Sequence, residues 1–375
     1  MIHKIRLQNI RSFSNAEFEF SDGVNLIIGP NGSGKTTILE SIGLFAFGSY
    51  LGAGQDVQAV AFGNEVGRVE IEGEKEGSEV SAECVIFEGG KIFKVLTNKI
   101  PASQMIGYFK AVLFNPETIN LVSGAPQVRR KELDVVIAQK KRVFVRTLLE
   151  YKNVLKQRNQ LIKRIVLKQA QEGELEFWNG ELIRLAGIII FERKKFLKTI
   201  NSDIARVHEQ LIGGKSTLSL QYLPSCDYGR FGELLVANLE HDLRAGLTLY
   251  GPHRDDFSFQ MRSENKNQES RIKNQGGDER TQISLREQAS RGEQRLAAVA
   301  FKMETKKYLA DGDGPILIFD DIFSELDEAR RESVASILDG DSLDRARDRQ
   351  IFISATDEHI VPVGLKKKAK IIRLE

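Results

Sequence analysis

The chain has 375 residues, 41% of them hydrophobic, which is enough for one large or two medium domains with a sizeable core. Its 54 basic and 52 acidic residues nearly cancel, so overall charge gives no attraction to a polyanion and only local clusters could. Two distant cysteines, Cys84 and Cys226, argue against a disulfide framework or a zinc site, and the longest apolar run, 185–191, is too short to span a membrane. These features predict a cytoplasmic protein without a membrane partner.

The first 30 residues are predicted to form three β-strands. Polar and apolar residues alternate in IHKIRLQNI (2–10) and in AEFEFSDG (16–23), whereas VNLII (24–28) is a continuous apolar run. Alternation is typical of a half-buried strand, and a short apolar run before a glycine is typical of a buried one. We therefore expect the third strand to lie inside a sheet and to lead into a turn.

Residues Gly29–Thr37, GPNGSGKTT, match the phosphate-loop pattern between that strand and a predicted helix. The glycines let backbone amides turn toward phosphates, and the helix N-terminus adds a favourable dipole. Lys35 is expected to reach the terminal phosphates, and the Thr36 hydroxyl to ligate Mg²⁺. The alternative, a glycine-rich turn with an accidental lysine, is disfavoured by the flanking strand and helix. The expected nucleotide contacts are Gly29, Pro30, Asn31, Gly32, Ser33, Gly34, Lys35, Thr36 and Thr37.

The next segments divide the chain. Residues 67–99 hold short strand-like stretches separated by Gly, Lys and Glu turns, which predict an antiparallel sheet beside the main one. Residues 127–213 contain no proline and few glycines, and their apolar residues recur every three or four positions, as in helices. We expect a nucleotide-binding lobe in two parts, 1–126 and 214–375, with a helical lobe, 127–213, inserted between them.

The helical lobe is rich in cations. Between Arg129 and Lys168 there are thirteen basic residues and three acidic ones. Spacings of three, four and seven residues place several of them on one side of a helix, where they would meet duplex phosphates without reading sequence. The alternative is a solvated helix face. Few aromatic residues lie among them, so base stacking on single strands is not indicated. The expected DNA contacts are Arg129, Arg130, Lys152, Lys156 and Lys163.

Strand-like sequence returns after the helical lobe. LSLQYLP (218–224) predicts a strand, 232–246 a short helix, and TLYGPHRDDFSFQM (248–261) a strand, a turn and a strand. The GPHRDD turn has no clear role from its residues: a structural turn with a paired arginine and a functional site are equally compatible with it. Residues 262–282 hold one aliphatic residue and predict a polar loop. Two further strands are expected in IFISATD and AKIIRLE, within 351–375.

ASRGEQRLAAVAFK (289–302) is predicted to be a helix whose N-terminus forms a second anion site. Ser290 and Gly292 would offer a hydroxyl and unpaired amides at the positive end of the helix dipole. One nucleotide does not need two such sites from one chain. We therefore expect this helix end to cover a nucleotide held by a second copy, in a two-fold dimer. The alternative is an ordinary serine N-cap followed by glutamate.

PILIFDD (315–321) is predicted to be a buried strand whose carboxyl end carries two carboxylates, where ligands of parallel α/β sheets bind. Asp320 is expected to hold Mg²⁺ through water, and Asp321 to orient or deprotonate an attacking water. Such a pair is otherwise often a turn or a helix cap. The phosphate loop favours the chemical interpretation, in which Lys35, Asp320 and Asp321 are catalytic and Thr36 and Asp320 are the metal ligands.

The order of phosphate loop, helical insertion, Ser-x-Gly-x-Gln signature and acidic strand resembles that of ABC-type ATPases, and within them of the SMC-like DNA repair proteins. Over nearly its whole length the chain resembles the RecF family of bacterial recombination mediators. The resemblance implies an α/β ABC-type ATPase head, with mixed sheets flanked by helices, and an inserted all-helical second lobe. The segments that carry it are NIRSF (9–13), GPNGSGKTTILESIGL (29–44), FNPETINLVSGAPQVRRKELD (114–134), YKNVLKQRNQLIK (151–163), TLYGPHRDDFSF (248–259), SRGEQR (290–295), ILIFDDIFSELD (316–327) and IFISATD (351–357).

The resemblance also assigns roles around the nucleotide. Ser290, Gly292 and Gln294, with Glu293 between the last two, would be the signature that reaches the γ-phosphate held by the partner copy. SELD, 324–327, would be the D-loop that crosses the dimer interface, and Arg11 falls where SMC-like ATPases place an arginine near the phosphates.

Other positions refine the assignment. Asn115 and Glu117 would lie in the Q-loop that couples the two lobes. Thr356 stands where many ABC ATPases have a switch histidine, which argues for the RecF family and against a transporter subunit. Asp321 replaces the usual glutamate, so a weak DNA-dependent ATPase that works as a switch is expected. The polar loop 262–282 is longer than the tight connection expected there.

The resemblance finally implies a cellular role. The chain would bind ATP and Mg²⁺, form an ATP-dependent homodimer and clamp double-stranded or gapped DNA. With RecO and RecR it would help to load RecA, with links to replication restart and the SOS response. One alternative is another SMC-like ABC ATPase that acts as a scaffold or as a defence-system partner. A second, the nucleotide-binding subunit of a membrane transporter, is disfavoured by Thr356 and by the basic helical lobe.

Overall fold

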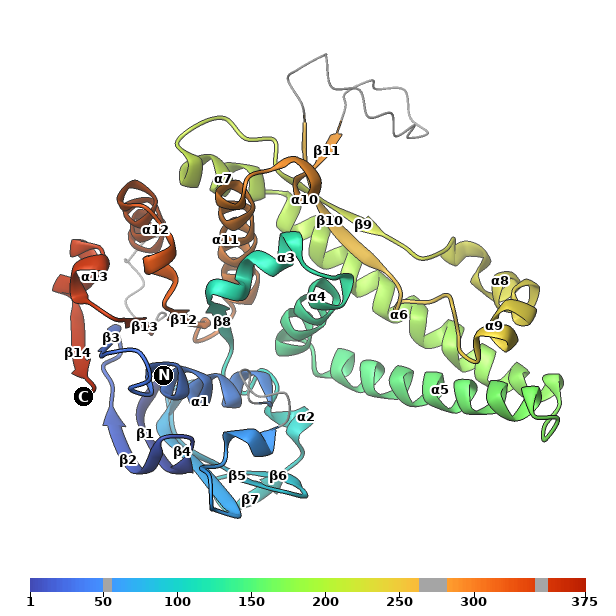
Figure 1. Ribbon diagram of the computed structural model, residues 1–375, viewed down its shortest axis with the longest axis horizontal. Helices are drawn as coiled ribbons and strands as arrows, with labels where there is room; N and C mark the ends of the chain where they lie inside the picture. The colour runs from blue at the N-terminus through green and yellow to red at the C-terminus, as the bar shows by residue number, and fades with distance from the viewer. Residues whose placement is uncertain (50–55, 263–281, 341–349) are drawn as a thin grey trace. The chain divides into compact units, whose positions relative to one another are not determined.

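The computed structural model describes residues 1–49, 56–262, 282–340 and 350–375 (Figure 1). These residues form two compact units. Unit 1 contains residues 1–118, 206–215 and 298–375, and unit 2 contains residues 119–205 and 216–297. Residues 216–297, which the sequence assigns to the nucleotide-binding lobe, therefore pack with the helices of unit 2. The prediction that residues 127–213 form the lobe that binds DNA stays a prediction.

Unit 1 is built on a parallel five-stranded sheet with the order β14-β3-β13-β12-β8. The predicted strands at 24–28, 315–321 and the C-terminal segment are confirmed. β3 pairs with β13 on one side and β14 on the other, so an early strand is inserted between two late ones. All residues of β3 and β13 are buried, as continuous apolar strands of parallel sheets require. The strands are β3 (Val24–Ile28), β8 (Ala111–Phe114), β12 (Ile316–Asp320), β13 (Ile351–Ala355) and β14 (Ala369–Arg373).

The second sheet of unit 1 is antiparallel, as predicted, and has the order β2-β1-β4-β5-β6-β7. Its strands alternate buried and exposed residues, which is most regular in β4 and β5. The strands are β1 (Ile2–Ile10), β2 (Phe13–Glu19), β4 (Val66–Lys75), β5 (Ser78–Phe87), β6 (Gly90–Val95) and β7 (Asn98–Ile100). The helices with residues in unit 1 are α1 (Lys35–Phe47), α2 (Ala102–Met105), α7 (Ile204–Ile212), α11 (Arg291–Leu309), α12 (Glu328–Gly340) and α13 (Val363–Lys367).

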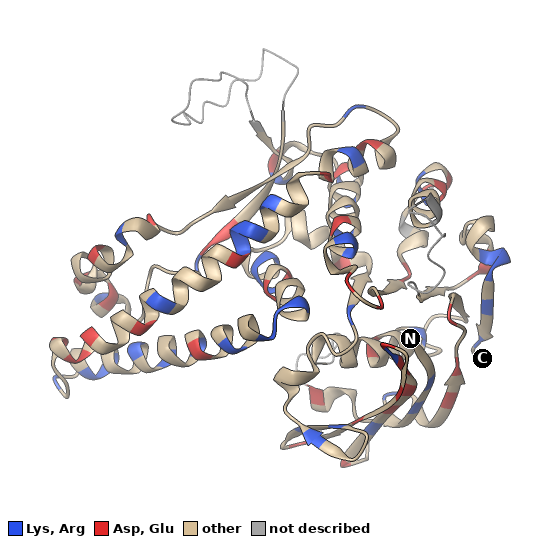
Figure 2. Cartoon of the chain, turned by 180° about the vertical axis from the view of Figure 1, so that it is seen from behind, with Lys and Arg blue, Asp and Glu red and all other residues tan. Residues whose placement is uncertain are grey.

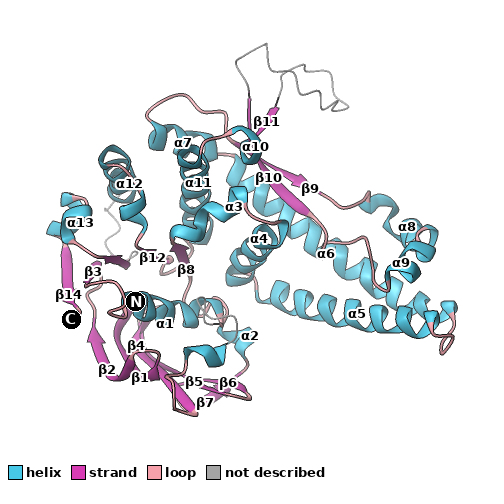
Figure 3. Ribbon diagram, in the orientation of Figure 1, coloured by secondary structure: helices cyan, strands magenta, loops and turns pink. Residues whose placement is uncertain are grey.

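Unit 2 combines long helices with a three-stranded antiparallel sheet, β11-β10-β9 (Figure 3). The predicted helical segment is confirmed, and α5 packs along α6. Its elements are α3 (Asn120–Ser123), α4 (Pro126–Lys140), α5 (Arg142–Val166), α6 (Leu175–Asn201), β9 (Ser219–Leu223), α8 (Phe231–Ala237), α9 (Leu239–Ala245), β10 (Asp256–Arg262), β11 (Gln282–Ser284) and α10 (Leu285–Gln288).

Short 3-10 helices occur in both units. They are η1 (Asp56–Ala59), η2 (Pro116–Ile119), η3 (Glu172–Glu174), η4 (Tyr228–Arg230), η5 (Ile322–Glu325) and η6 (Glu358–Ile360).

Two predictions in the 232–261 region are wrong. The single helix expected at 232–246 is broken at Asn238 into α8 and α9, and the Asn238 side chain donates to the Leu234 carbonyl. The first strand expected at 248–250 does not form. Thr248 and Leu249 instead donate their amides to the side chains of Asn159 and Asp242, at 2.8 and 3.0 Å, so their backbone is bound by side chains rather than by a ladder.

The remaining predictions concern the polar loop, the helix that follows it and the absence of a membrane span. Nearly all of the predicted polar loop 262–282 lies outside the described residues. The helix expected at 289–302 is α11, which begins at Arg291. Among the described helices, none has the length and apolar character needed to cross a lipid bilayer.

Candidate nucleotide site

The phosphate loop joins β3 to α1 and depends on its glycines. Gly32 and Gly34 have φ angles of 87° and 98°, in the left-handed region that favours glycine. A Cβ atom at Gly34 would lie 2.5 Å from the Phe13 ring, and one at Gly29 would lie 2.8 Å from the Leu374 carbonyl oxygen. The loop therefore packs too closely against its neighbours to carry side chains at these positions.

Lys35 begins α1 and points back into the loop. Its Nζ donates to the carbonyl oxygens of Gly29 and Pro30, at 2.7 and 2.8 Å, and the residue is 7% exposed. Neutral carbonyls hold the ammonium without cancelling its charge. The lysine is thus oriented inside the loop, where it can also meet an anion.

Thr36 and Asp320 lie together at the carboxyl end of the parallel sheet. The Thr36 hydroxyl donates to Asp320 Oδ1 at 3.1 Å, and the Ser354 hydroxyl donates to the same oxygen at 2.7 Å. Burial raises the pKa of Asp320, against the opposing effect of these two hydrogen bonds. This contact brings a hydroxyl and a carboxylate oxygen together, and hard oxygen groups of this kind fit the predicted Mg²⁺ site.

Asp321 follows in a left-handed backbone conformation, with φ of 52°. Its amide donates to the Ser354 hydroxyl at 2.9 Å, and its carbonyl accepts from the Ser324 hydroxyl at 2.7 Å. The backbone is therefore fixed on both sides. Its buried Oδ1 atom meets no hydrogen-bond donor among the described residues, so this oxygen is left for a ligand or water.

These groups line a pocket of about 350 Å³ in unit 1. The lining comes from Asn31 and Gly32 of the loop, 34–37 of the loop and α1, the turn 11–12, and the pair 320–321. The structure thus brings the predicted phosphate loop, acidic strand and Arg11 to one cavity. Arg11 Nη2 lies 2.8 Å from Glu40 Oε2, on the next turn of α1.

The predicted signature lies in unit 2, at the start of α11. The Ser290 amide and hydroxyl both donate to Glu293 Oε2, at 2.7 and 2.8 Å, so an N-terminal capping box forms as the simpler interpretation expected. Gln294 is 7% exposed, and its amide group donates to the carbonyls of Leu285 and Ala289, both at 3.1 Å. Ser290 is nevertheless exposed, and Gly292 is half-buried.

The remaining predicted positions around the nucleotide are surface or turn residues of unit 1. Asp327 caps α12 by accepting from the Arg330 amide at 2.9 Å, and Ser324 is exposed. Asn115 shares a turn with Thr118, whose hydroxyl accepts from the Asn115 amide at 2.9 Å. Glu117 and Thr356 are exposed.

Lys and Arg residues recur along the long helices (Figure 2). Those predicted to bind DNA separate into two groups by burial. Lys152, Lys156 and Lys163 are exposed on α5. The Arg129 side chain is 4% exposed and makes two hydrogen bonds to the Asp256 carboxylate, at 2.7 and 2.8 Å. Arg130 is half-buried and donates to the Asp255 carbonyl at 2.6 Å. These two arginines are committed to internal contacts because GPHRDD folds back on α4, which a count of charges does not reveal.

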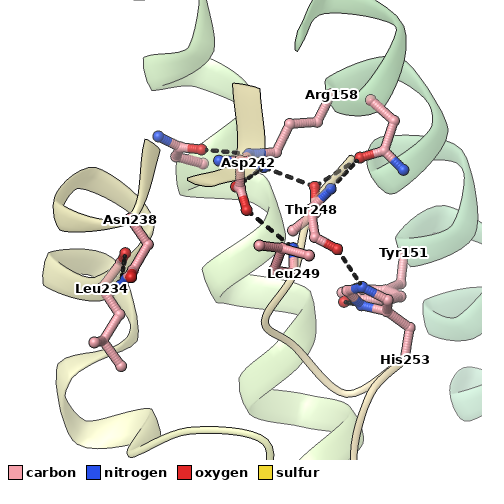
Figure 4. A network of polar contacts seen from close by, with 10 residues as sticks. Tyr151, Arg158, Leu234, Asn238, Asp242, Thr248, Leu249 and His253 are labelled. Carbon is pink, nitrogen blue, oxygen red and sulfur yellow. Dashed lines mark hydrogen bonds and ion pairs between the residues drawn. The ribbon is translucent and has the colours of Figure 1, made fainter. Parts of the chain in front are cut away.

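The GPHRDD turn, 251–256, makes contacts with side chains of α4, α5 and α6, and Figure 4 shows those of His253. His253 Nδ1 lies 2.7 Å from the Tyr151 hydroxyl, and its Nε2 lies 3.1 Å from the Thr248 carbonyl. Burial lowers the pKa of His253 to about 4, so the ring is neutral near pH 7. The contacts assign one tautomer, in which Nε2 donates to Thr248 and Nδ1 accepts from Tyr151.

Arg158, which sequence reasoning counted among the α5 cations, is fully buried beside this turn. Its Nη1 donates to Asp242 Oδ2 at 2.8 Å and to the Thr248 hydroxyl at 2.6 Å, and its Nε donates to the Asn179 side chain at 2.8 Å. The guanidinium therefore joins α5, α6, α9 and the segment before the turn (Figure 4).

Asp255 completes the arrangement. Its carboxylate accepts from the hydroxyls of Tyr222 and Tyr228, at 2.5 and 2.8 Å, and from the Ser225 amide at 2.7 Å. We use the name turn cluster for residues 251–256 and the side chains that bind them or Thr248. Its hydrogen bonds lie within unit 2, so the turn acts as a structural junction between helices and sheet.

Sequence reasoning missed two residues of the pocket region. Ser354 binds both Asp320 and the Asp321 amide, and its signal was its position at the end of a strand parallel to the acidic one. Glu40 contacts Arg11, and its signal was the spacing of four from Thr36, which places both on one face of α1.

Comparison with known proteins agrees with this geometry. The model of the family described as RecF/RecN/SMC N terminal domain matches residues 1–373. A DNA replication and repair protein RecF from Geobacillus sp. (strain WCH70) is 30% identical, with 99% of this chain and 96% of the relative covered. The chain belongs to the RecF family. A RecF from Moorella thermoacetica is also 30% identical, over 100% of this chain and 94% of the relative.

Solved structures support the RecF family assignment and the fold. The recombination mediator protein RecF with ATP superposes with a TM-score of 0.83 and 27% identity, covering 96% of this chain and 93% of that one. An Smc head bound to the C-winged helix domain of ScpA gives a TM-score of 0.54 at 16% identity, which shows the fold alone. The chain therefore has the predicted α/β ABC-type ATPase head with helices, as RecF and SMC heads do.

Proposed function

We propose that this chain is an ATP-dependent DNA-binding protein of recombinational repair that acts in the cytoplasm in the RecFOR pathway. The observation that carries the proposal is the pocket in which the phosphate loop, Arg11 and the pair Asp320–Asp321 meet. Its relatives are RecF proteins of DNA replication and repair, and one of them is solved with ATP. With RecO and RecR, the protein would assist RecA loading at gaps and contribute to replication restart and the SOS response.

The pocket residues divide the work of holding ATP. Lys35 faces the terminal phosphates with its charge intact, and the loop amides surround them. Thr36 and Asp320 would hold Mg²⁺, which would offset the negative charge of the phosphates when bound. Ser354 fixes the orientation of Asp320 by donating to the oxygen that also faces Thr36.

Asp321 is the residue we assign to hydrolysis. Its backbone is anchored by Ser354 and Ser324, while its buried Oδ1 stays free of hydrogen bonds to described residues. Such an oxygen is placed to orient or accept a proton from an attacking water. Aspartate reaches less far than glutamate, which favours slow turnover and the use of hydrolysis as a switch that reopens the protein.

Dimerisation on ATP would use the start of α11. Ser290 is exposed and Gly292 is half-buried, so the first amides of the helix are accessible to an anion from another copy. The Ser290 hydroxyl donates to Glu293 in this structure and would turn to a γ-phosphate in the dimer. Gln294 then acts through the backbone it supports, because its amide group braces the segment before the helix.

DNA would lie along α5, in the helical lobe. Its exposed cations recur on one side of the helix, and the single acid of the helix, Glu150, lies at the edge of that side, four residues after Arg146 and 3.9 Å from Arg184 of α6. From Arg142 to Arg164 the helix rises about 33 Å, close to one turn of duplex DNA. This row of exposed cations on α5 would bind phosphates without contacting bases, which suits a protein that clamps duplex DNA at gaps. Its members are Arg142, Arg146, Lys152, Lys156, Lys163 and Arg164.

Sedimentation velocity with ATP, with and without gapped duplex, tests the nucleotide part. The wild type should dimerise, Lys35→Met should neither bind ATP nor dimerise, and Ser290→Arg should bind ATP yet stay monomeric. Ser202→Arg, at another exposed serine of unit 2, is the matched control and should dimerise normally. A Ser290→Arg protein that dimerised like the control would remove the role of α11 in the partner's site.

Charge reversal tests the DNA part. Changing Lys152, Lys156 and Lys163 to glutamate should weaken duplex binding at least tenfold and flatten its dependence on salt, because three phosphate contacts are lost. The control reverses three exposed lysines elsewhere, Lys99, Lys367 and Lys370, with the same change in net charge. Equal effects of the two triple variants would remove α5 from the DNA site.

A further inference from the structure

Arg11 is presented to the pocket by a constrained turn between β1 and β2. Its φ angle is 45° and that of Asn9 is 51°, both in a region that non-glycine residues rarely adopt. The Arg11 amide donates to the Ala59 carbonyl at 2.8 Å, and the Asn9 carbonyl accepts from the Ala61 amide at 2.9 Å. Local strain of this kind persists where the surroundings fix the backbone, and here it fixes the base of one side chain at the pocket wall.

One partner of that side chain is Glu40. Glu40 is on α1, one turn beyond Thr36 and on the same face. Its Oε2 lies 2.8 Å from Arg11 Nη2, and the side chains are 11% and 30% exposed, respectively. This buried Oε2 accepts no hydrogen bond from the residues described, so charge attraction rather than hydrogen-bond geometry holds the guanidinium there.

The two cations of the pocket are therefore held in different ways. Lys35 donates to neutral carbonyls of its own loop, whereas Arg11 faces a carboxylate. A phosphate that binds Lys35 replaces contacts with neutral carbonyl groups. A phosphate that approaches Arg11 competes with a negative charge, which weakens its net gain.

The carboxylate is itself poorly stabilised. Burial raises the pKa of Glu40 to about 7, with Arg11 opposing the rise and the charge of Asp320 adding to it. The attraction of Arg11 thus offsets only part of the cost of burying the Glu40 charge. A partner of this kind holds the guanidinium in place but is readily exchanged for a stronger anion.

Building on the proposed nucleotide function, we propose that Glu40 is a positioning residue. It holds the Arg11 guanidinium at the pocket edge before nucleotide binds and gives it up to the phosphate oxygens when ATP enters. Glu40 touches neither nucleotide nor metal in this role and acts only through Arg11. The Arg11–Glu40 pair then acts as a brake, by which we mean that it lowers the affinity for ATP, because separating the two side chains costs part of the binding free energy.

A double-mutant cycle on ATP affinity tests the proposal. Glu40→Gln keeps the shape and removes the charge, so it should tighten the Kd for ATP about tenfold. Arg11→Ala should weaken it, and the double variant should bind like Arg11→Ala alone, since Glu40 acts only on Arg11. Glu17→Gln, at an exposed carboxylate paired with Arg6 in the same sheet, is the matched control and should change nothing.

The outcomes separate this proposal from the function it depends on. Wild type that fails to bind ATP contradicts the proposed function and this inference with it. Wild type that binds ATP with the same or higher affinity than Glu40→Gln overturns the inference alone. An effect of Glu40→Gln that persists in the Arg11→Ala background does so too, because it would not act through Arg11. Thermal melts of each variant, together with Glu40→Asp as a shorter carboxylate that should keep the brake, guard against misfolding.

Discussion

The nucleotide pocket of unit 1 and the turn cluster of unit 2 are both rich in buried polar groups, but they use them differently. In the pocket region, Ser33 Oγ, Glu40 Oε2 and Asp321 Oδ1 have no hydrogen-bond partner among the described residues. In the turn cluster, Asp255 alone accepts three hydrogen bonds, and among the described residues of the cluster only Arg158 Nη2 is buried without a partner. Similar residue types therefore serve a ligand in one place and cohesion in the other.

The difference has an energetic meaning. A buried polar atom without a partner costs roughly 1–3 kcal/mol, so the pocket carries a destabilisation, which a ligand can relieve at Asp321 but not at Glu40. The turn cluster, with one such atom in Arg158, carries less of this cost. Its members instead depend on one another, and removing one leaves the rest buried without a partner.

The largest effect is expected from the turn cluster. Arg158→Leu should lower the free energy of unfolding by about 3–5 kcal/mol, because it leaves the Asp242 carboxylate buried without its cation. Arg244→Leu, which removes an exposed pair with Glu240, is the control and should cost less than about 0.5 kcal/mol. Denaturant unfolding measures both. Equal losses would mean that the cluster does not hold unit 2 together.

A smaller effect of opposite sign is expected from the pocket. The folded-state pKa of Glu40 is raised to about 7, so the folded protein binds a proton between pH 4.5 and 7 that the unfolded chain does not, and stability falls as pH rises through that window. Glu40→Gln removes this loss. The variant should match wild type at pH 5 and exceed it at pH 8 by about 2 kcal/mol, after allowance for solvent screening.

Unfolding curves of Glu40→Gln and wild type across pH 5 to 8 make this measurement, and Glu17→Gln serves again as the exposed control. Arg11 and Asp320 are the charged groups whose fields act on Glu40. A stability difference that stayed constant with pH would show that Glu40 does not titrate in the pocket.

The smallest effect is expected from the loss of a single hydrogen bond in the turn cluster. Tyr151→Phe removes the hydroxyl that donates to His253 Nδ1 and leaves that nitrogen buried without a donor, at a cost of about 1 kcal/mol. Tyr250→Phe, at a half-buried tyrosine of the neighbouring segment, should change the free energy of unfolding by less than about 0.5 kcal/mol. If both variants melted alike, the contact with His253 would contribute nothing.

The sequence predicted the residues of the pocket better than it predicted which cations of the helices are exposed. The phosphate loop and Asp320 follow strongly apolar strands, and the carboxyl ends of parallel strands meet at one edge, so local pattern and fold agree. Arg129 and Arg158 sit in an equally clear helical pattern, yet both are buried by partners far along the chain, Asp256 and Asp242. Charge spacing reports which face of a helix a residue is on, and not what covers that face.

The same reasoning explains the errors near 248. TLY has the composition of a strand, but hydrogen bonds from its backbone to Asn159 and Asp242 replace the ladder. The partners come from α5 and α9, which no local pattern connects with this segment. Glu40 and Ser354 were missed for a related reason, since their roles arise from neighbours brought together only by the sheet.

The position of β3 between β13 and β14 has a consequence for folding. β3 leads into the phosphate loop, yet both strands that flank it lie about 320 or more residues later in the chain. Contacts of such long sequence separation form slowly, because the entropy of closing the intervening chain is lost before the pairing stabilises it. The phosphate loop is therefore held in place only after the late strands of unit 1 have docked on both sides of β3.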